Sequence, residues 1–222
     1  TTEQVNGMSR LKILLVGHLI FLSGCTQYSP PELIPTSFYL NPEKDLETIG
    51  KTALVELSNE SVVHQVSSDV TEALFQEIQK RQIFGMMKVS QNDPVWRSLQ
   101  LNIDSNYTLE ELAQIRKTMK CDAVLTGTIT GFTPYPHMAL GLRLRLIDAS
   151  DGRLLWAMEQ VWDTTDKATQ GRIEAYYSPK RLVFSDENLS GQLGSVSSLK
   201  FFKFIAYEIA GTLQSGNKGG PL

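Results

Sequence analysis

Cysteine and histidine are scarce in this sequence. Its 222 residues include two cysteines, Cys25 and Cys121, and three histidines. Neither type occurs at a spacing such as His-x-x-x-His or Cys-x-x-Cys, with which proteins commonly hold zinc. Two cysteines also cannot build the disulfide framework of a small secreted domain. We therefore predict no metal site, and we interpret Cys121 as a small buried hydrophobic residue.

The sequence also lacks a large excess of either charge, and it lacks catalytic motifs. Lys and Arg number 21 against 24 Asp and Glu, which gives a net charge of -3 without a basic block. The electrostatic footprint of a nucleic-acid-binding protein is therefore missing. The sequence has neither a Gly-x-Ser-x-Gly nucleophile motif nor a phosphate-binding Gly-x-x-x-x-Gly-Lys-Ser/Thr loop. We predict that the protein is not an enzyme and that it has no cofactor and no nucleic-acid partner.

Long apolar runs are the third absence. A transmembrane helix needs about 20 apolar residues, and the run from Ile13 to Leu22 is roughly half that length. Arg10 and Lys12 precede this run, and small residues follow it. A basic start, a short apolar run and small residues are the layout of an export signal.

The end of this signal carries more information than any other part of the chain. Residues 22–25 have the sequence Leu-Ser-Gly-Cys, which resembles the lipobox of bacterial lipoproteins. The resemblance implies that Cys25 carries a diacylglycerol on its sulfur, that the chain is cut before Cys25, and that acyl chains anchor it to a membrane. Thr26, rather than Asp, follows the cysteine, which in lipoproteins of this kind favours the outer membrane. An ordinary secretory signal with a chance cysteine is the main alternative.

Composition divides the chain into five parts. An upstream segment precedes Met8, a signal peptide follows, and a tether with four prolines leads into a single periplasmic domain and a flexible tail. We expect these parts at residues 1–7, 8–24, 25–47, 48–214 and 215–222. Alternatively, part of the tether packs along the domain, because Phe38, Tyr39 and Leu40 are apolar or aromatic.

Hydrophobic periodicity predicts an α/β domain with a mixed sheet and helices packed on it. The expected order is strand, helix, strand, helix, three strands and helix. Alternating residues over 140–146 and a similar run over 154–162 flank Asp151-Gly152, which predicts an antiparallel hairpin. Thr108 and Glu111 have the spacing of a capping box. In the last helix, we expect Leu199 on the buried stripe and Glu208 off it.

Two segments resemble a known superfamily. Residues 120–129, Lys-Cys-Asp-Ala-Val-Leu-Thr-Gly-Thr-Ile, resemble its element of a helix end, an Asp and an apolar strand with glycine. Residues 144–156 resemble its hairpin with an Asp-Gly turn and a tryptophan. The superfamily contains the periplasmic domain of the curli secretion lipoprotein, the lipoprotein activators of penicillin-binding proteins, and the amino-terminal domain of the Tol-Pal translocation protein. The resemblance implies a periplasmic α/β domain that works in an envelope assembly.

Two groups of residues are candidates for binding a partner. Arg143 and Arg145 share the outward face of their strand, and they form a positive strip for an acidic partner if that face is open. A solvated sheet face is the alternative. The second group combines aromatic rings with positive charge, as interface hot spots often do, although a plain loop would have the same composition. It consists of Tyr176, Tyr177, Lys180 and Arg181.

The sequence thus predicts a lipid-anchored accessory or scaffold lipoprotein that faces the periplasm. It would act through contacts with envelope proteins, self-association included. One alternative is a ring-forming subunit of a secretion or export apparatus. Another, from a different functional class, is an envelope enzyme or small-ligand binder whose site lies in the segment after residue 163.

Overall fold

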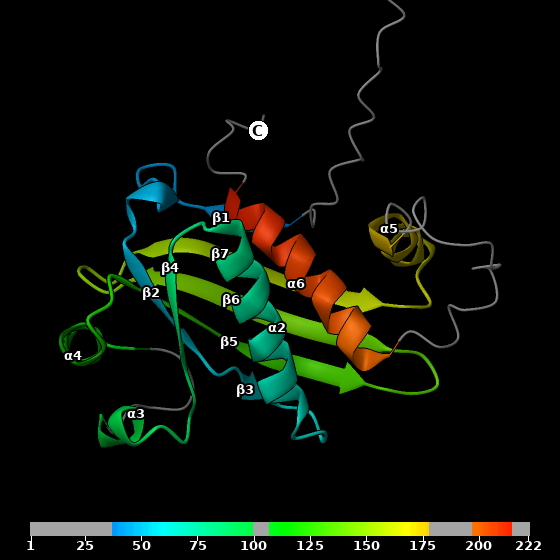
Figure 1. Ribbon diagram of the computed structural model, residues 1–222, viewed down its shortest axis with the longest axis horizontal. Coiled ribbons are helices and arrows are strands. Elements are labelled where there is room, and N and C mark those ends of the chain that lie inside the picture. Colours follow the sequence, from blue (N-terminus) through cyan, green and yellow to red (C-terminus); the bar gives the residue numbers. More distant parts are fainter. Residues whose placement is uncertain (1–36, 100–106, 178–196, 215–222) are drawn as a thin grey trace, which may run out of the picture. The chain divides into compact units, whose positions relative to one another are not determined.

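The computed structural model describes residues 37–99, 107–177 and 197–214 (Figure 1). Strands and helices alternate in the first part of the chain, followed by three long strands and two helices. The strands are β1 (Phe38–Leu40), β2 (Lys51–Val55), β3 (Ser58–Asn59), β4 (Gly85–Val89), β5 (Ala123–Thr133), β6 (Ala139–Asp148) and β7 (Leu154–Asp163). The helices are α2 (Val66–Arg81), α3 (Pro94–Ser98), α4 (Leu109–Met119), α5 (Lys167–Tyr177) and α6 (Ser198–Gln214), and a 3-10 turn, η1, spans Leu46–Thr48.

All seven strands belong to one open, mixed sheet. Its order is β1-β7-β6-β5-β2-β4, with the short β3 paired to β5 beside this path. β2 is parallel to both β4 and β5, whereas β5, β6, β7 and β1 are antiparallel to their neighbours. The predicted mixed α/β class and the antiparallel meander of three strands are confirmed. The strands β2 and β4 are joined through α2, which is the crossover that parallel neighbours require.

One face of the sheet carries the larger core. Helices α2 and α6 cross this face (Figure 1), and their apolar stripes contact the inward side chains of β5, β6 and β7. Because side chains alternate along a strand, every second residue of β6 is directed into this core. Its members from the meander include Leu140, Leu142, Leu144, Leu146, Trp156 and Trp162.

A smaller core lies on the opposite face, beside β2 and β4. Trp96 of α3 and Ile115 of α4 pack there with Val89 of β4. Cys121 belongs to this core and is 1% exposed, as predicted for a small buried hydrophobic residue. Burial raises the pKa of its thiol, which disfavours the reactive thiolate. The capping box that starts α4 is also confirmed, with Thr108 and Glu111 each accepting from the other's backbone N–H.

Residues before the predicted domain boundary at residue 48 already contact the sheet. β1 pairs with β7, so that Tyr39 lies opposite Ala157. The backbone N–H of Asn41 donates to Leu155 O at 2.8 Å. Lys44 donates to Asp148 and Asp151 at the β6–β7 hairpin. From residue 38 to residue 44, the chain therefore packs along the domain, which was the alternative considered for this part of the tether.

Helix α6 differs from its predicted pattern at two positions. Leu199, expected on the buried stripe, is 55% exposed, whereas Glu208, expected outside it, is completely buried. The helix starts at Ser198, and residues 198–200 are half-buried or exposed, so an apolar residue there meets solvent. Glu208 is buried because two donors from distant segments bind its carboxylate, and helical periodicity contains no information about them.

Candidate functional site

The antiparallel half of the sheet presents a face that is largely exposed. We call it the open face, and we define it by Tyr39, Arg143, Glu159 and Val161. It lies opposite the core formed with α2 and α6, because Arg143 alternates with Leu142 and Leu144, which are both in that core. Val161 is 65% exposed and Tyr39 is 46% exposed. An exposed apolar side chain and a tyrosine on one sheet face are suited to contact with a protein.

Arg143 and Glu159 form an ion pair at the centre of the open face. The two residues lie directly opposite each other on β6 and β7. Arg143 donates from Nε to Oε2 at 3.0 Å and from Nη2 to Oε1 at 2.8 Å. These hydrogen bonds raise the pKa of Arg143 and lower that of Glu159. The bidentate pair holds the guanidinium parallel to the carboxylate, so both ions are presented in a fixed geometry.

Arg145 has a different environment from Arg143, although both lie on the same side of β6. It is half-buried and lies opposite Thr126 of β5. Tyr107 lies close to both, since Thr126 hydrogen-bonds to its hydroxyl and the charge of Arg145 acts on it. Burial nevertheless raises the pKa of Tyr107. The two arginines therefore have different surroundings: Arg143 is exposed and paired with Glu159, whereas Arg145 is half-buried beside Tyr107.

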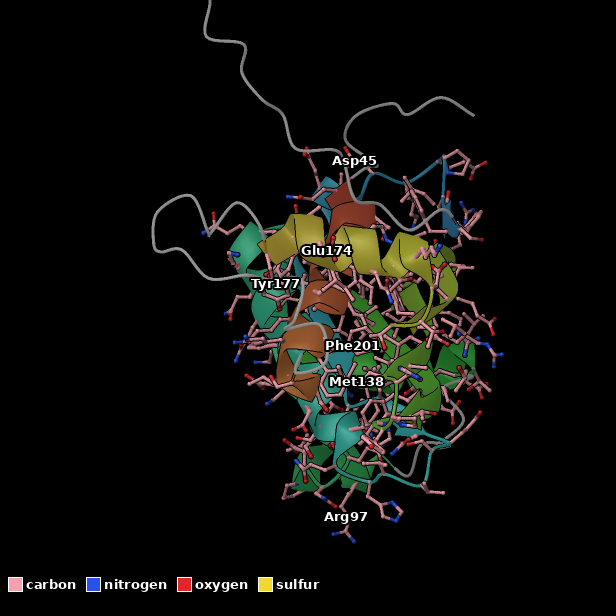
Figure 2. All side chains as sticks on the ribbon, turned by 90° about the vertical axis from the view of Figure 1, so that its right-hand side faces the viewer. Asp45, Arg97, Met138, Glu174, Tyr177 and Phe201 are labelled. Carbon is pink, nitrogen blue, oxygen red and sulfur yellow. The ribbon has the colours of Figure 1, made fainter. Side chains whose placement is uncertain are left out.

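Tyr176 and Tyr177, from the second group of candidates, lie at the end of α5 and pack toward α6. Figure 2 shows α5 crossing α6, with Tyr177 labelled near one end of α5. The Tyr177 hydroxyl donates to Lys200 O at 2.8 Å, and burial raises its pKa to about 12. The Tyr176 ring lies 4.7 Å from the Tyr207 ring, centroid to centroid. These contacts attach α5 to the domain, so part of each tyrosine surface is already occupied.

Three further predicted site residues, Cys25, Lys180 and Arg181, lie outside the described residues. Lipid attachment at Cys25 stays a prediction, as does partner binding by the other candidates. In the described ranges, no helix has the length and apolar character needed to cross a membrane. No group of three His, Cys, Asp or Glu residues that could hold a metal ion occurs in the same ranges.

A buried polar network behind the meander was missed by the sequence analysis. Glu208 of α6 accepts from Trp162 Nε1 at 2.6 Å and from Arg172 Nε at 2.8 Å. Trp162 belongs to β7 and Arg172 to α5, so the carboxylate joins three elements. Burial raises the pKa of Glu208, an effect that the two donors oppose. A clue was present, since Glu208 interrupts the apolar run of α6 one residue before Ile209-Ala210.

The comparisons with known proteins add only similar structures. No protein-family model matches the chain, and no curated protein matches it either. Among solved structures, the chain is similar to the PelC dodecamer from Paraburkholderia phytofirmans, with 11% identity over 83% of this chain and 97% of that one, at a TM-score of 0.48. It is also similar to lipoprotein GNA1162 from Neisseria meningitidis, with 13% identity over 61% of this chain and 99% of that one, at a TM-score of 0.45.

A third similar structure is the LpoB carboxy-terminal domain from Salmonella enterica. The identity is 22% over 51% of this chain and 83% of that domain, at a TM-score of 0.39. Because all three TM-scores are below 0.5, these likenesses carry no argument about function. The proposals below depend on this chain's own residues.

Proposed function

We propose that this protein is a lipid-anchored accessory protein of the bacterial envelope that acts by protein–protein contact. The observation that carries the proposal is the sequence Leu-Ser-Gly-Cys at residues 22–25, directly after a short apolar run. Acylation at Cys25 would fix the chain to the outer membrane and leave its folded domain in the periplasm. Several acyl chains on one cysteine exceed the two-signal requirement for stable membrane attachment.

The open face is our candidate for the contact with the envelope partner. Val161 and Tyr39 offer apolar area, while Arg143 and Glu159 offer a preformed ion pair with known geometry. The partner that fits is a folded envelope protein with an apolar residue opposite Val161 and hydrogen-bonding groups opposite the ion pair. Exposed ion pairs at an interface contribute to the choice of partner more than to affinity.

Acylation is tested by replacing Cys25 with Ser in the native host. Wild-type protein labelled with radioactive palmitate should carry the label, and the Cys25→Ser variant should carry none and accumulate as an unprocessed precursor. Cys121→Ala is the matched control, because it removes the other cysteine, which is buried, and should keep the label. An unlabelled wild-type chain, or a labelled Cys25→Ser chain, would refute the anchor.

The contact face is tested separately by photo-crosslinking in intact cells. A photoreactive amino acid at Val161 should give one cross-linked product of defined mass. The same amino acid at Val62, which is 90% exposed but outside the open face, should not. Arg143→Glu should abolish the cross-linked product. The double variant Arg143→Glu/Glu159→Arg restores the internal ion pair but exchanges the positions of its two charges, so it should not recover the product fully. A product at both valines, or at neither, would contradict this use of the face.

A further inference from the structure

Strand β4 is a sheet edge at the end opposite to β1. It is the last strand of the sheet order, and it spans five residues, Gly85–Val89, against three for β1. An edge strand presents a row of N–H and C=O groups that can pair with another strand. Natural proteins usually block such edges with a charge, a proline or a bulge. The structure of β4 shows which backbone groups face outward.

The register of β4 against β2 shows which N–H and C=O groups of β4 point toward β2 and which point away from it. Gly85 N donates to Gly50 O at 2.9 Å, and Glu56 N donates to Val89 O at 2.8 Å. In a parallel pair, alternate residues bond to the same neighbour. Gly85, Met87 and Val89 therefore bond to β2, and the backbone groups of Met86 and Lys88 point away from it. In the described ranges, no backbone group bonds to these two residues from the outer side.

The side chains of β4 leave this edge unobstructed. Met86 packs against the larger core and Met87 against the smaller one, so each lies above or below the sheet. The Lys88 ammonium bonds to Glu72 of α2, which holds the charge over the sheet face and away from the edge. Gly85 and Lys88 are exposed, and Met86 and Met87 are half-buried. The strand contains no proline and no bulge.

We propose that β4 pairs with β4 of a second copy of this chain, antiparallel and about a two-fold axis at Met87. In that register, Met86 lies opposite Lys88 of the second copy, and Lys88 lies opposite its Met86. Both outward residues then exchange N–H···O=C bonds with their partners, so all four outward groups of each copy are satisfied. A like-charge contact is avoided, because each lysine faces a methionine across the strands.

A second copy fits this edge because, in this register, each Lys88 lies opposite a Met86 and no two lysines meet across the strands. The two outward residues are equally far from Met87, so a two-fold axis there maps each donor onto an acceptor. The pairing would join two seven-stranded sheets edge to edge and leave both open faces accessible. It does not depend on the proposed function, because it requires neither the lipid nor the envelope partner.

Disulfide trapping tests the register directly. Met87→Cys would place two cysteines in a non-hydrogen-bonded pair, whose Cα atoms lie about 4.5 Å apart and within disulfide range. Met86→Cys is the matched control, because its two copies would lie about 7–8 Å apart on the diagonal, beyond that range. Both are introduced into the full chain and exposed to a mild oxidant in the envelope fraction, with the unsubstituted chain as baseline.

We expect at least about tenfold more covalent dimer from Met87→Cys than from Met86→Cys, given the steep geometric limits of a disulfide. Equal trapping at both positions would mean random collision and would overturn the proposal. Failure of Met87→Cys to exceed the baseline would overturn it as well. Cys121 is 1% exposed, so it does not compete for the oxidant.

A proline variant tests the same pairing without a new thiol. Lys88→Pro removes an outward N–H, which is not used by the β2–β4 ladder, so the fold should tolerate it. Lys88→Ala is the control, because it loses the same ion pair with Glu72 but keeps the N–H. After subtraction of the detergent mass, the wild type and Lys88→Ala should have the mass of a dimer, and Lys88→Pro should have the mass of a monomer. The far-ultraviolet circular dichroism spectrum of Lys88→Pro should be unchanged. A monomeric wild type, or a folded dimeric Lys88→Pro variant, would refute the pairing.

Discussion

Replacing Arg172 with Met tests whether a buried ion pair attaches α5 to the domain. Arg172 Nε donates to Glu208 Oε1 at 2.8 Å, and the carboxylate is completely buried. Its other hydrogen bond comes from Trp162, 2.6 Å away. Without Arg172, the ionised form of the carboxylate would lie in the core with only one neutral donor. Removing one partner of a buried pair costs about 3–5 kcal/mol. Because the Arg172 side chain is 25% exposed, we expect about 3 kcal/mol, the lower end of that range.

The cost should depend on pH in a defined direction. Burial raises the pKa of Glu208 in the folded state above its ordinary value of 4.5. The folded protein therefore binds this proton more tightly than the unfolded chain does, and the resulting stabilisation is present below 4.5. It is lost as the pH rises through the folded-state pKa. Arg172→Met removes a group that opposes this increase, so the free energy of unfolding of the variant should fall more steeply with rising pH than that of the wild type.

Urea unfolding, followed by tryptophan fluorescence from pH 4.5 to about pH 7.5, measures both effects. Arg153→Met is the matched control, because Arg153 pairs with Glu43 at the surface, and such pairs are worth about 0–1 kcal/mol. Adding Glu208→Gln to Arg172→Met should recover most of the loss, since it removes the unpaired charge. The reasoning is refuted if Arg172→Met costs no more than Arg153→Met, or if its cost is the same at both ends of the pH range.

Two further predictions concern the backbone. Gly127→Ala should destabilise the fold by about 3 kcal/mol or more, because the new Cβ would lie 2.2 Å from Arg143 O on β6. Gly131→Ala is the control, since its Cβ would have no atom within 4 Å, and it should cost less than about 1 kcal/mol in thermal unfolding. Similar costs at both glycines would contradict the close approach at Gly127. Thr108→Ala should lower the free energy of unfolding by about 1 kcal/mol, because α4 loses its cap. Thr108→Ser keeps the hydroxyl that accepts from Glu111 N, so it should cost much less in the same assay. Equal losses of stability in the two variants would show that the hydroxyl does not cap the helix.

Much of the fold was predictable because its elements are encoded locally. The alternation over residues 140–146 and the Asp151-Gly152 turn predicted the β6–β7 hairpin, and Gly152 indeed has a φ of 73°. The short strands β1 and β3 were not predicted. Each has only two or three residues, too few for a periodic pattern, and each exists because a long neighbouring strand supplies its hydrogen bonds.

The candidate surface was predictable in part for the same reason. Strand alternation placed Arg143 and Arg145 on one side of β6, which the structure confirms. It did not reveal that Glu159 lies opposite Arg143, because strand register depends on the whole hairpin. Nor did it show that Tyr176 and Tyr177 pack toward α6, which requires α5 to fold back onto the domain.

Sequence alone predicts the export signal with its cysteine, and it determined the order of the longer strands and helices, the hairpin and the capping box. All of these depend on residues close together in the chain, where spacing and residue type determine the structure. Tertiary structure decided which face of the meander stays open, which edge of β4 has no strand beside it in the described ranges, and that Glu208 is buried. These features arise where distant segments meet: Glu208 can be buried only because Trp162 and Arg172, 46 and 36 residues away, supply its hydrogen bonds.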